Sequence, residues 1–433
     1  MSERQLGVPP RVVGKASLPS GRVGGVSLRG RRIAAIGLVF TLLAACGGNA
    51  KPASTVTLDW YVGPDRVDAA ALARSCSTGD YRIVVKELPT DVEERHAALV
   101  RRLAAKDTSI DLLSLDTSFT AEFAEAQFLA PIPEDLVTAY SQDTVPTALD
   151  AATYEGALVA APWWFDPQLL WFRGNVAERA GLDVTKAVSF DDLIAGAQRL
   201  GLTIQIDDPD GSGLAEWVNA LVTGSGGELL GGKGREAEVG LQTEAGRSAA
   251  GVVEFFNEAN VGPGPSRDAL EAFAGPNGGF LLGPSSIISD PAVATIAADL
   301  GWSAYPTVGT TSVAPLSGVA LAVPLYAKNT GRSYEAITCL TSPSVMLTLM
   351  SGAGHSSSRL TTYDDPALGT SFPMAFVTKT AVQSGRSAPK TPYWHLVRSA
   401  IDQSWRPLAE VTVDDTPAQS QRIVTARLRG ELP

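Results

Sequence analysis

The chain has 433 residues, of which 45% are hydrophobic and 19% charged, with a formal net charge of −11 at neutral pH. This composition is typical of a globular protein and excludes collagen-like and charge-rich disordered chains. The acidic balance excludes partners recognised through a basic surface, so we expect no nucleic-acid partner.

The N-terminal segment, residues 1–45, is interpreted as a signal peptide. Seven Lys or Arg residues precede a 13-residue uncharged run, residues 33–45, which is too short to span a bilayer as a mature helix. The run ends in Leu-Ala-Ala-Cys at residues 43–46, similar to the lipobox of bacterial lipoproteins, in which the cysteine is acylated and the chain is cut before it. The alternative is an ordinary signal peptide with an incidental Cys46. Arg31 and Arg32 leave the general secretory and twin-arginine export routes both open.

Cleavage before Cys46 leaves 28 basic and 45 acidic side chains, a net charge of −17. Membrane attachment must then come from the lipid, because Gly, Pro or charge interrupts every apolar run in residues 47–433. Residues 46–54 read as a flexible tether. The remaining length exceeds one comfortable core and suggests two domains.

Two further cysteines, Cys76 and Cys339, follow the tether. Outside the cytoplasm such a pair usually forms a disulfide, here joining early and late parts of the chain. Two buried free thiols are the alternative.

The first hundred residues after the tether alternate strand and helix. Strands are expected at 56–62, 81–88 and 110–116, and Asp91 begins a helix over 91–106. Strand–helix–strand order at this spacing predicts a parallel sheet with right-handed crossovers. Such sheets bind ligands at the carboxyl ends of their strands, where Asp116 lies.

Later segments continue the α/β pattern. Amphipathic helices are expected at 189–200, 213–224 and 244–260, a buried strand within 315–327, and two short helices within 333–354 that are split at a proline.

Several chemistries have no motif here. The three histidines are far apart in sequence, and no H-E-x-x-H or G-x-S-x-G pattern is present. Residues 227–234 lack the Ser/Thr of a phosphate-binding loop, and residues 206–213 lack the first and last ligands of a calcium loop, so both are interpreted as turns. We expect no metal, no cofactor and no enzymatic activity, although a converging pair of carboxylates, as in glycosidases, remains open.

The aromatic segment 161–173, APWWFDPQLLWFR, combines the two kinds of group that a sugar site needs. A flat ring covers the C–H face of a sugar, and a carboxylate accepts hydrogen bonds from neighbouring hydroxyls. Period-2 alternation would bury about half of such a strand. We expect Leu169, Leu170 and Phe172 in the core. At least one of the three aromatic residues 163–165 should face a cleft, with Asp166 beside it.

Four segments carry a family resemblance over nearly the whole mature chain: the lipobox and residues 110–132, 156–173 and 317–324. They are similar to the solute-binding lipoproteins of carbohydrate ABC importers, and most similar in pattern to the trehalose-binding lipoproteins of actinobacteria. The resemblance implies an α/β, two-lobed periplasmic-binding-protein-like fold of type II, each lobe a mostly parallel sheet flanked by helices, joined by hinge crossings. It places residues 55–158 and 270–320 in the N-terminal lobe and residues 159–269 and 321–433 in the C-terminal lobe.

The resemblance also implies site residues. Cys76 and Cys339 match the family's disulfide positions. Among the expected ligand contacts, the positions that match the family are Asp116, Phe119, Asp166, Trp217, Asn219, Arg359 and Trp394, and the aromatic segment adds Trp163 and Trp164. Core packing of Trp217 and a surface ion pair of Arg359 are the alternatives. Gly283 stands where family members usually carry a stacking aromatic residue before a proline.

The expected function is that of a monomeric, lipid-anchored receptor on the extracytoplasmic face of the membrane. Its partners are a sugar, a trehalose-like disaccharide or small oligosaccharide, and the permease subunits of an ABC importer. A secreted carbohydrate hydrolase is one alternative. A receptor of the same fold for an amino acid, peptide or polyol is the other.

Overall fold

The computed structural model describes residues 55–431. The predicted signal peptide, the lipidation site Cys46 and the tether lie outside these residues. Within the described part, no single helix has the length and apolar character needed to cross a bilayer, and one bent pair of helical segments, Thr330–Leu340 with Pro343–Ala353, meets that test by length and composition.

A nine-stranded mixed sheet forms the frame of the described chain, in the order β10-β7-β11-β6-β15-β3-β1-β2, with β12 also paired to β6. Its strands are β1 (Val56–Val62), β2 (Tyr81–Glu87), β3 (Leu112–Asp116), β6 (Ala161–Arg173), β7 (Thr203–Asp207), β10 (Pro265–Ser266), β11 (Gly278–Pro284), β12 (Leu300–Ser303) and β15 (Leu316–Ala322). Three two-stranded ladders are peripheral: β4 (Thr153–Tyr154) with β5 (Ala157–Leu158), β8 (Leu230–Gly231) with β9 (Glu238–Val239), and β13 (Thr307–Val308) with β14 (Thr311–Ser312).

Helices follow most strands, as expected for an α/β chain. They are α1 (Ala69–Cys76), α2 (Val92–Ala104), α3 (Thr120–Glu125), α4 (Glu134–Ser141), α5 (Pro146–Ala151), α6 (Val176–Arg179), α7 (Phe190–Leu200), α8 (Gly213–Gly224), α9 (Glu244–Glu258), α10 (Ala269–Ala274), α11 (Pro291–Ala294), α12 (Thr330–Leu340), α13 (Pro343–Thr348), α14 (Leu368–Ser371), α15 (Ala375–Ser384), α16 (Trp394–Trp405) and α17 (Thr416–Arg429).

Local sequence signals fix several helix ends. The Asp91 carboxylate accepts hydrogen bonds from the backbone N–H groups of Glu93 and Glu94 and so caps α2. Ser189 caps α7 in the same way, and α7 ends at Gly201 in a left-handed conformation that favours glycine. The helices predicted at 189–200, 213–224 and 244–260 are confirmed.

The strand directions confirm the predicted parallel units. β1 is parallel to β2 and to β3, and β7 is parallel to β10 and β11. β15 runs antiparallel to β3 and β6, and β6 runs antiparallel to β11 and β12, so the sheet is mixed. The α/β architecture is therefore confirmed, with antiparallel strands at its centre.

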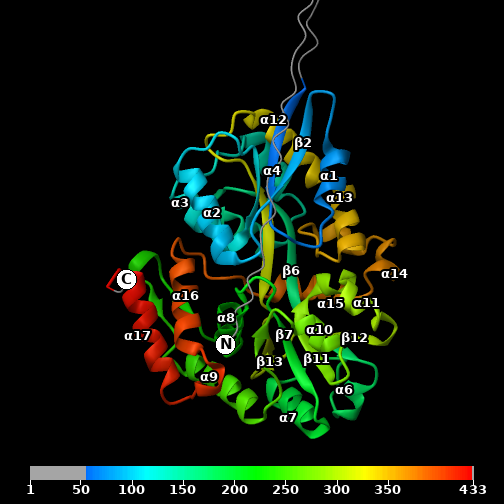
Figure 1. The fold of residues 1–433 in the computed structure, drawn as a ribbon, viewed down its shortest axis with the longest axis vertical. Coiled ribbons are helices and arrows are strands. Elements are labelled where there is room, and N and C mark those ends of the chain that lie inside the picture. The colour runs from blue at the N-terminus through cyan, green and yellow to red at the C-terminus, as the bar shows by residue number, and fades with distance from the viewer. Residues whose placement is uncertain (1–54, 432–433) are drawn as a thin grey trace, which may run out of the picture. The chain divides into compact units, whose positions relative to one another are not determined.

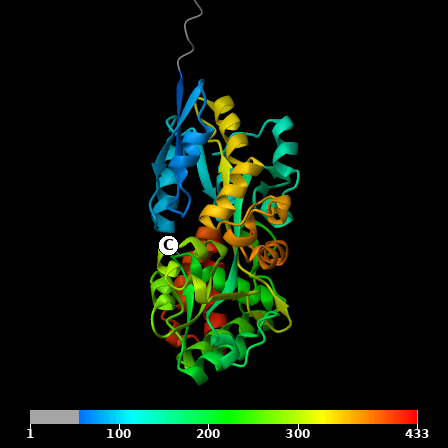
Figure 2. The same cartoon turned by 90° about the vertical axis from the view of Figure 1, so that its right-hand side faces the viewer.

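The buried hydrophobic residues form separate clusters, and these divide the described chain into two lobes. Strands β1–β3 pack with α1, α2, α3, α12 and α13 in the first lobe. Strands β7, β11 and β12 pack with α7, α8, α9, α16 and α17 in the second. The 13-residue β6 runs through both, because Trp163 belongs to a core of the first lobe and Leu169 to that of the second. Figure 1 shows β6 along the long axis between the blue-cyan and green groups, which Figure 2 shows from the side.

The division of the chain differs from the one expected. Residues 270–320 were assigned to the first lobe, but β11 pairs with β7 and β6 of the second lobe. Residues 321–433 were assigned to the second lobe, but α12 packs against α1, and Cys339 forms a disulfide with Cys76 of α1. We therefore revise the first lobe to include α12 and α13. The predicted disulfide is confirmed.

Candidate functional site

A cavity of about 390 Å³ lies between the two lobes. Three of its walls are the carboxyl ends of strands: residues 63–66 follow β1, Asp116 ends β3, and Asp207 ends β7. A smaller cavity of about 200 Å³ shares Asp116, Glu216 and Ser317 with it. Strand ends in an α/β sheet leave backbone and side chains free to meet a ligand, so the predicted location is the one with the space for it.

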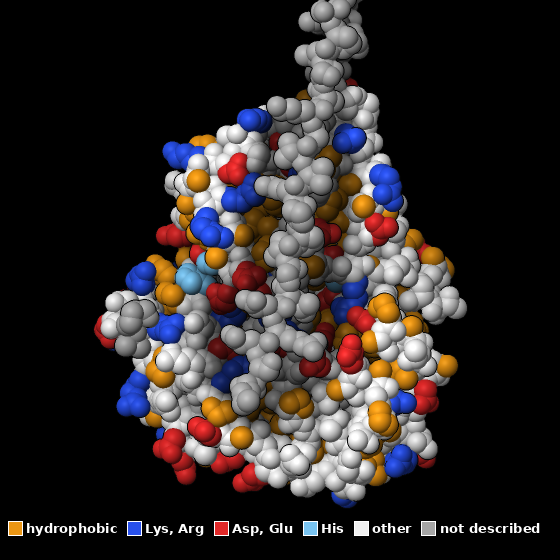
Figure 3. Space-filling view, viewed as in Figure 1, with side chains coloured by type: hydrophobic (Ala, Val, Ile, Leu, Met, Phe, Trp, Pro, Cys, Tyr) orange, Lys and Arg blue, Asp and Glu red, His pale blue; other side chains and the backbone are white. Residues whose placement is uncertain are grey.

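The cavity lining is strongly acidic. Eight carboxylates contribute to it: Asp65, Asp116, Asp166, Asp207, Asp208, Asp210, Glu216 and Asp290. Arg66, Arg95 and His355 are its basic lining residues. Figure 3 shows acidic side chains gathered near the middle of the face that carries this region. These carboxyl groups make the lining rich in potential hydrogen-bond acceptors.

Burial raises the pKa of four of these carboxyls, those of Asp65, Asp207, Asp208 and Glu216. Burial raises the pKa of Asp207 to about 7, and Oδ2 of this side chain has no hydrogen-bond partner within the described chain. Burial, and then the charge of Asp210, raise the pKa of Glu216 to about 8. Both groups line the cavity, so a ligand that donates hydrogen bonds would relieve part of their desolvation.

Two arginines of the first lobe reach across to carboxylates of the second. The Arg95 guanidinium lies 2.6 Å from Oδ2 of Asp210 and 3.7 Å from Oδ2 of Asp116. The Arg66 guanidinium lies 2.9 Å from Oδ2 of Asp290. All three pairs neutralise part of the acidic lining, and those with Asp210 and Asp290 connect the two lobes.

Trp164, His355 and Asp166 form one side of the cavity. The rings of Trp164 and His355 are stacked, with centroids 4.1 Å apart. Nδ1 of His355 lies 2.7 Å from Oδ2 of Asp166, while His355 Nε2 and Trp164 Nε1 have no hydrogen-bond partner within the described chain. Trp164 is the sole Trp, Tyr or Phe among the lining residues. It supplies an apolar face to the cavity, and the two unpartnered ring nitrogens are buried beside it.

Asp166 has a different role from the one expected. Its Oδ1 accepts hydrogen bonds from the Ser356 backbone N–H (2.6 Å) and the Ser285 hydroxyl (3.3 Å), and its Oδ2 faces His355. The residue is 2% exposed. Because its oxygens already have partners, we interpret Asp166 as a positioning residue for His355.

The turn predicted at residues 206–213 is confirmed. Oδ1 of Asp208 accepts hydrogen bonds from the backbone N–H groups of Gly211 and Gly213, both at 2.9 Å. A Cβ atom on Gly213 would lie 2.8 Å from the Asp208 carboxyl carbon, so glycine is needed where α8 begins. This turn brings Asp210 and Glu216 to the cavity.

Four aromatic residues expected to contact the ligand lie in the cores instead: Phe119, Trp163, Trp217 and Trp394, each at most 2% exposed. The indole N–H of Trp163 donates to the Leu340 carbonyl, and Trp217 packs edge-on against Phe256. Neither is among the lining residues of the cavity. We therefore no longer expect these four residues to contact the solute. Asp116 and Trp164 line the cavity and remain expected contacts.

Two polar residues also have structural partners. The Arg359 guanidinium donates to the backbone carbonyls of Ala139, Gln142 and Thr341. The Asn219 amide donates to the Ser387 carbonyl. Neither residue lines the larger cavity, so we no longer expect them to contact the solute.

Gly283 is buried against residues of the second core. A Cβ atom built on it would meet Asp207 and Leu281 at 3.4 Å and Ile287 at 3.5 Å. The Gly283 position therefore lies within the second core, and Trp164 is the stacking surface that the described cavity provides.

Sequence reasoning missed several lining residues, among them Arg66, Arg95, Asp207, Glu216 and His355. The strand-end rule that selected Asp116 would also have selected Asp207, which ends β7. His355 had no local signal, since it reaches the cavity from the segment between α13 and α14.

Comparisons with known proteins agree with this geometry. Residues 78–346 match the family described as bacterial extracellular solute-binding protein. A probable ABC transporter-binding protein of Deinococcus radiodurans is 21% identical over 334 residues, which cover 71% of this chain and 76% of that protein.

Solved structures share the fold. Maltose-bound MalE3 of T. maritima has a TM-score of 0.75 and 20% identity, covering 87% of this chain and 100% of that one. The GacH receptor of Streptomyces glaucescens, solved unliganded and with acarbose, has a TM-score of 0.73 and 19% identity, covering 88% and 100%. A solute-binding protein of Agrobacterium radiobacter in complex with ribitol has a TM-score of 0.72 and 18% identity, again covering 88% and 100%. The family match spans more than half of the sequence, and the chain belongs to the bacterial extracellular solute-binding proteins.

Proposed function

We propose that this protein captures a neutral, polyhydroxylated solute and delivers it to the permease of an ABC importer. The solute class is a sugar, either a trehalose-like disaccharide or a small oligosaccharide. The observation that carries the proposal is the cavity itself, in which the Trp164 ring lies among eight carboxylates. Carboxylates accept hydrogen bonds, and a sugar presents many hydroxyl donors around an apolar C–H face. Maltose, acarbose and ribitol complexes of proteins with this fold support that class.

Capture works through closure of the two lobes. A solute that contacts Asp116 of the first lobe and Asp207 of the second binds the closed state better than the open one, and only such a difference in affinity shifts the equilibrium. Closure also removes water from the cavity, which strengthens the polar contacts. The closed form then presents the surface that the permease recognises.

Isothermal titration calorimetry against a panel of solutes tests the proposal. Trehalose and maltose are a matched pair of disaccharides that differ in linkage, and maltotriose, ribitol, glutamate and a tripeptide represent the other classes. Saturable binding of a sugar that is recovered intact by chromatography supports the proposal. Appearance of a cleaved product would indicate a hydrolase. Binding of glutamate or the peptide alone would move the protein to another solute class.

The anchor is proposed to be a lipid on Cys46, which keeps the receptor at the extracytoplasmic face of the membrane as a monomer without catalytic activity. Cys46→Ser should move the protein from the membrane fraction to the soluble extracytoplasmic fraction, with solute affinity unchanged. Continued sedimentation of this variant with membranes would contradict the lipid anchor. Solute binding is measured separately by calorimetry, so the result for the anchor does not bear on it.

A further inference from the structure

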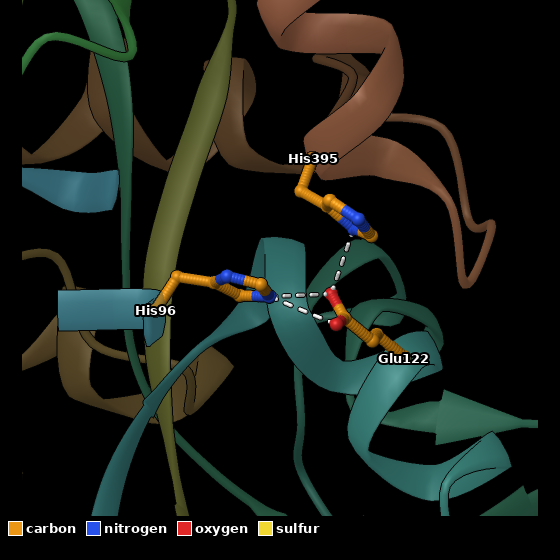
Figure 4. A group of neighbouring side chains, drawn as sticks. All are labelled: His96, Glu122 and His395. Atoms are coloured by element: carbon orange, nitrogen blue, oxygen red, sulfur yellow. Dashed lines mark hydrogen bonds and ion pairs between the residues drawn. The ribbon is translucent and has the colours of Figure 1, made fainter. Parts of the chain in front are cut away.

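A group of three side chains outside the cavity joins the two lobes. His96 lies on α2 and Glu122 on α3, both in the first lobe, and His395 lies in the first turn of α16, in the second lobe. One potential ligand atom from each residue lies within 4.8 Å of the other two. Figure 4 shows the two imidazoles approaching the carboxylate from two directions.

The contacts converge on the Glu122 carboxylate. Nε2 of His96 lies 2.8 Å from both carboxylate oxygens. Nδ1 of His395 lies 3.1 Å from Oε2, yet this buried atom has no hydrogen bond of proper geometry in the described chain. The two imidazoles are stacked, with centroids 5.0 Å apart. Three donor atoms thus point to one small region, and one of them lacks a hydrogen bond.

Two imidazole nitrogens and a carboxylate form a ligand set that suits Zn²⁺ and neighbouring divalent metals. Bonds of about 2.0–2.1 Å in a tetrahedron place ligand atoms about 3.3 Å apart. The two separations to Oε2, 2.8 and 3.1 Å, lie close to that spacing, and the two imidazole nitrogens lie within 4.8 Å of each other, so rotation of the imidazoles would bring all three atoms to an ion. The side chains of Glu122 and His395 are 18% and 28% exposed, which leaves a side for a water molecule as fourth ligand.

The surroundings hold the ligands in place without competing for them. His96 packs on Phe119, with ring centroids 5.1 Å apart. The nearby Arg398 guanidinium lies 2.9 Å from Glu93, so its charge is paired elsewhere. The Glu122 carboxylate therefore faces the two imidazoles, and its charge remains available to a cation.

We propose that His96, Glu122 and His395 bind a divalent transition-metal ion, with Zn²⁺ as the best match, and that the ion ties α16 of the second lobe to α2 and α3 of the first. Since its ligands come from both lobes, the ion binds the closed arrangement more tightly than an open one and stabilises closure. By linkage, an ion and a solute that both prefer the closed state strengthen each other's binding.

Cobalt titration tests the metal site directly. Co²⁺ gives visible absorption bands whose intensity reports coordination geometry, whereas Zn²⁺ has none. Protein dialysed against a chelator should take up one Co²⁺ per chain, and Zn²⁺ should displace it. His96→Ala, Glu122→Gln and His395→Ala should each weaken the affinity at least tenfold. Glu125→Gln is the matched control, because Glu125 lies on α3 and its carboxylate contacts Tyr154. It should leave the affinity unchanged.

Two outcomes would overturn the metal site. No saturable Co²⁺ or Zn²⁺ binding at millimolar concentration would mean that the cluster is only a hydrogen-bonded bridge. An unchanged affinity in His395→Ala, with its melting curve intact, would place the ion elsewhere.

Closure is measured separately by small-angle X-ray scattering without solute. Zn²⁺ should lower the radius of gyration of the wild-type protein and leave that of His395→Ala unchanged. If Zn²⁺ binds with normal affinity but does not change the radius of gyration, the ion does not bridge the two lobes. Neither measurement uses a sugar, so failure here is distinct from failure of the proposed solute.

Discussion

Oδ2 of Asp166 lies 2.7 Å from Nδ1 of His355, and both residues are buried at the side of the cavity. The Asp166 carboxylate accepts a hydrogen bond from Nδ1–H of His355, so Nε2 is the ring nitrogen left for another partner. Nε2 is buried and has no hydrogen-bond partner within the described chain, in a residue that lines the cavity. The pair connects a structural network to the binding surface.

Replacing Asp166 should therefore reduce stability as well as binding. Asp166→Ala leaves the Ser356 N–H and the His355 imidazole without their buried partner. Such losses typically cost about 3–5 kcal/mol in the free energy of unfolding. Urea denaturation measures this value. Asp116→Ala is the contrast: Asp116 is partly exposed and its carboxylate accepts one local hydrogen bond, from the Ser118 N–H, so the variant should lose solute binding with a much smaller loss of stability. Equal stability losses in both variants would contradict the distinction.

Two adjacent tryptophans should separate binding from folding. Trp164 is partly exposed and lines the cavity, so Trp164→Ala should weaken solute binding at least tenfold with a modest loss of stability. Trp163 is 1% exposed and donates to the Leu340 carbonyl, so Trp163→Ala should cost about 3–5 kcal/mol. Calorimetry and urea denaturation of both variants check the assignment. Tight solute binding by Trp164→Ala would exclude the ring as a sugar platform.

The aromatic segment also shows where sequence reasoning stops. Period-2 alternation predicts that half of residues 161–173 are buried, but nearly all of β6 is buried. The reason is its central place in the sheet, where β15, β11 and β12 pair with it and both faces are covered, as in buried strands of α/β proteins. The prediction of Leu169, Leu170 and Phe172 in the core is confirmed. Which aromatic ring reaches the cavity depended on tertiary packing.

Contacts between distant segments could not be predicted from the sequence either, because they also depend on tertiary packing. Strand-end position predicted Asp116 from local pattern alone, because the rule concerns one βα unit. His355 enters the cavity from a segment nearly 200 residues after Asp166. His96 and His395, which looked isolated in the sequence, meet at Glu122 because α16 packs beside α2 and α3. No local period encodes such a meeting, so the α/β class was predictable and these clusters were not.

The disulfide should contribute measurably to stability. Cys76 and Cys339 are separated by 263 residues, and the bond joins α1 to α12 within the first lobe. Loop-closure entropy for so long a loop gives up to about 5 kcal/mol, with native strain and residual structure reducing it. The Cys76→Ser/Cys339→Ser double variant should therefore melt at a lower temperature than the wild type. Reductant should lower the wild-type melting temperature and leave the double variant unaffected. Identical melting of all samples would contradict a stabilising bond.

Stability should fall as pH rises across the neutral range. The folded protein keeps a proton on Asp207 up to about pH 7 and on Glu216 up to about pH 8, whereas both carboxyls ionise near pH 4 when the chain is unfolded. Between about pH 4 and these folded-state pKa values, the folded state binds more protons than the unfolded state. The stability that these two groups contribute is therefore fully present below about pH 4 and is lost as the pH rises through their folded-state pKa values. Each unit of pKa difference corresponds to about 1.4 kcal/mol.

Asp207→Asn removes one of these titrations while keeping the side-chain shape. The variant should match the wild type at about pH 4 and melt several degrees higher at about pH 8, because it no longer needs to bury an ionised carboxylate. Gln205→Ala is the control, since Gln205 is a buried, non-titrating residue of the same strand, β7. It should shift the melting temperature equally at both pH values. Differential scanning calorimetry across this range measures the slopes, and parallel curves for wild type and Asp207→Asn would show that the Asp207 carboxyl is already ionised in the folded protein.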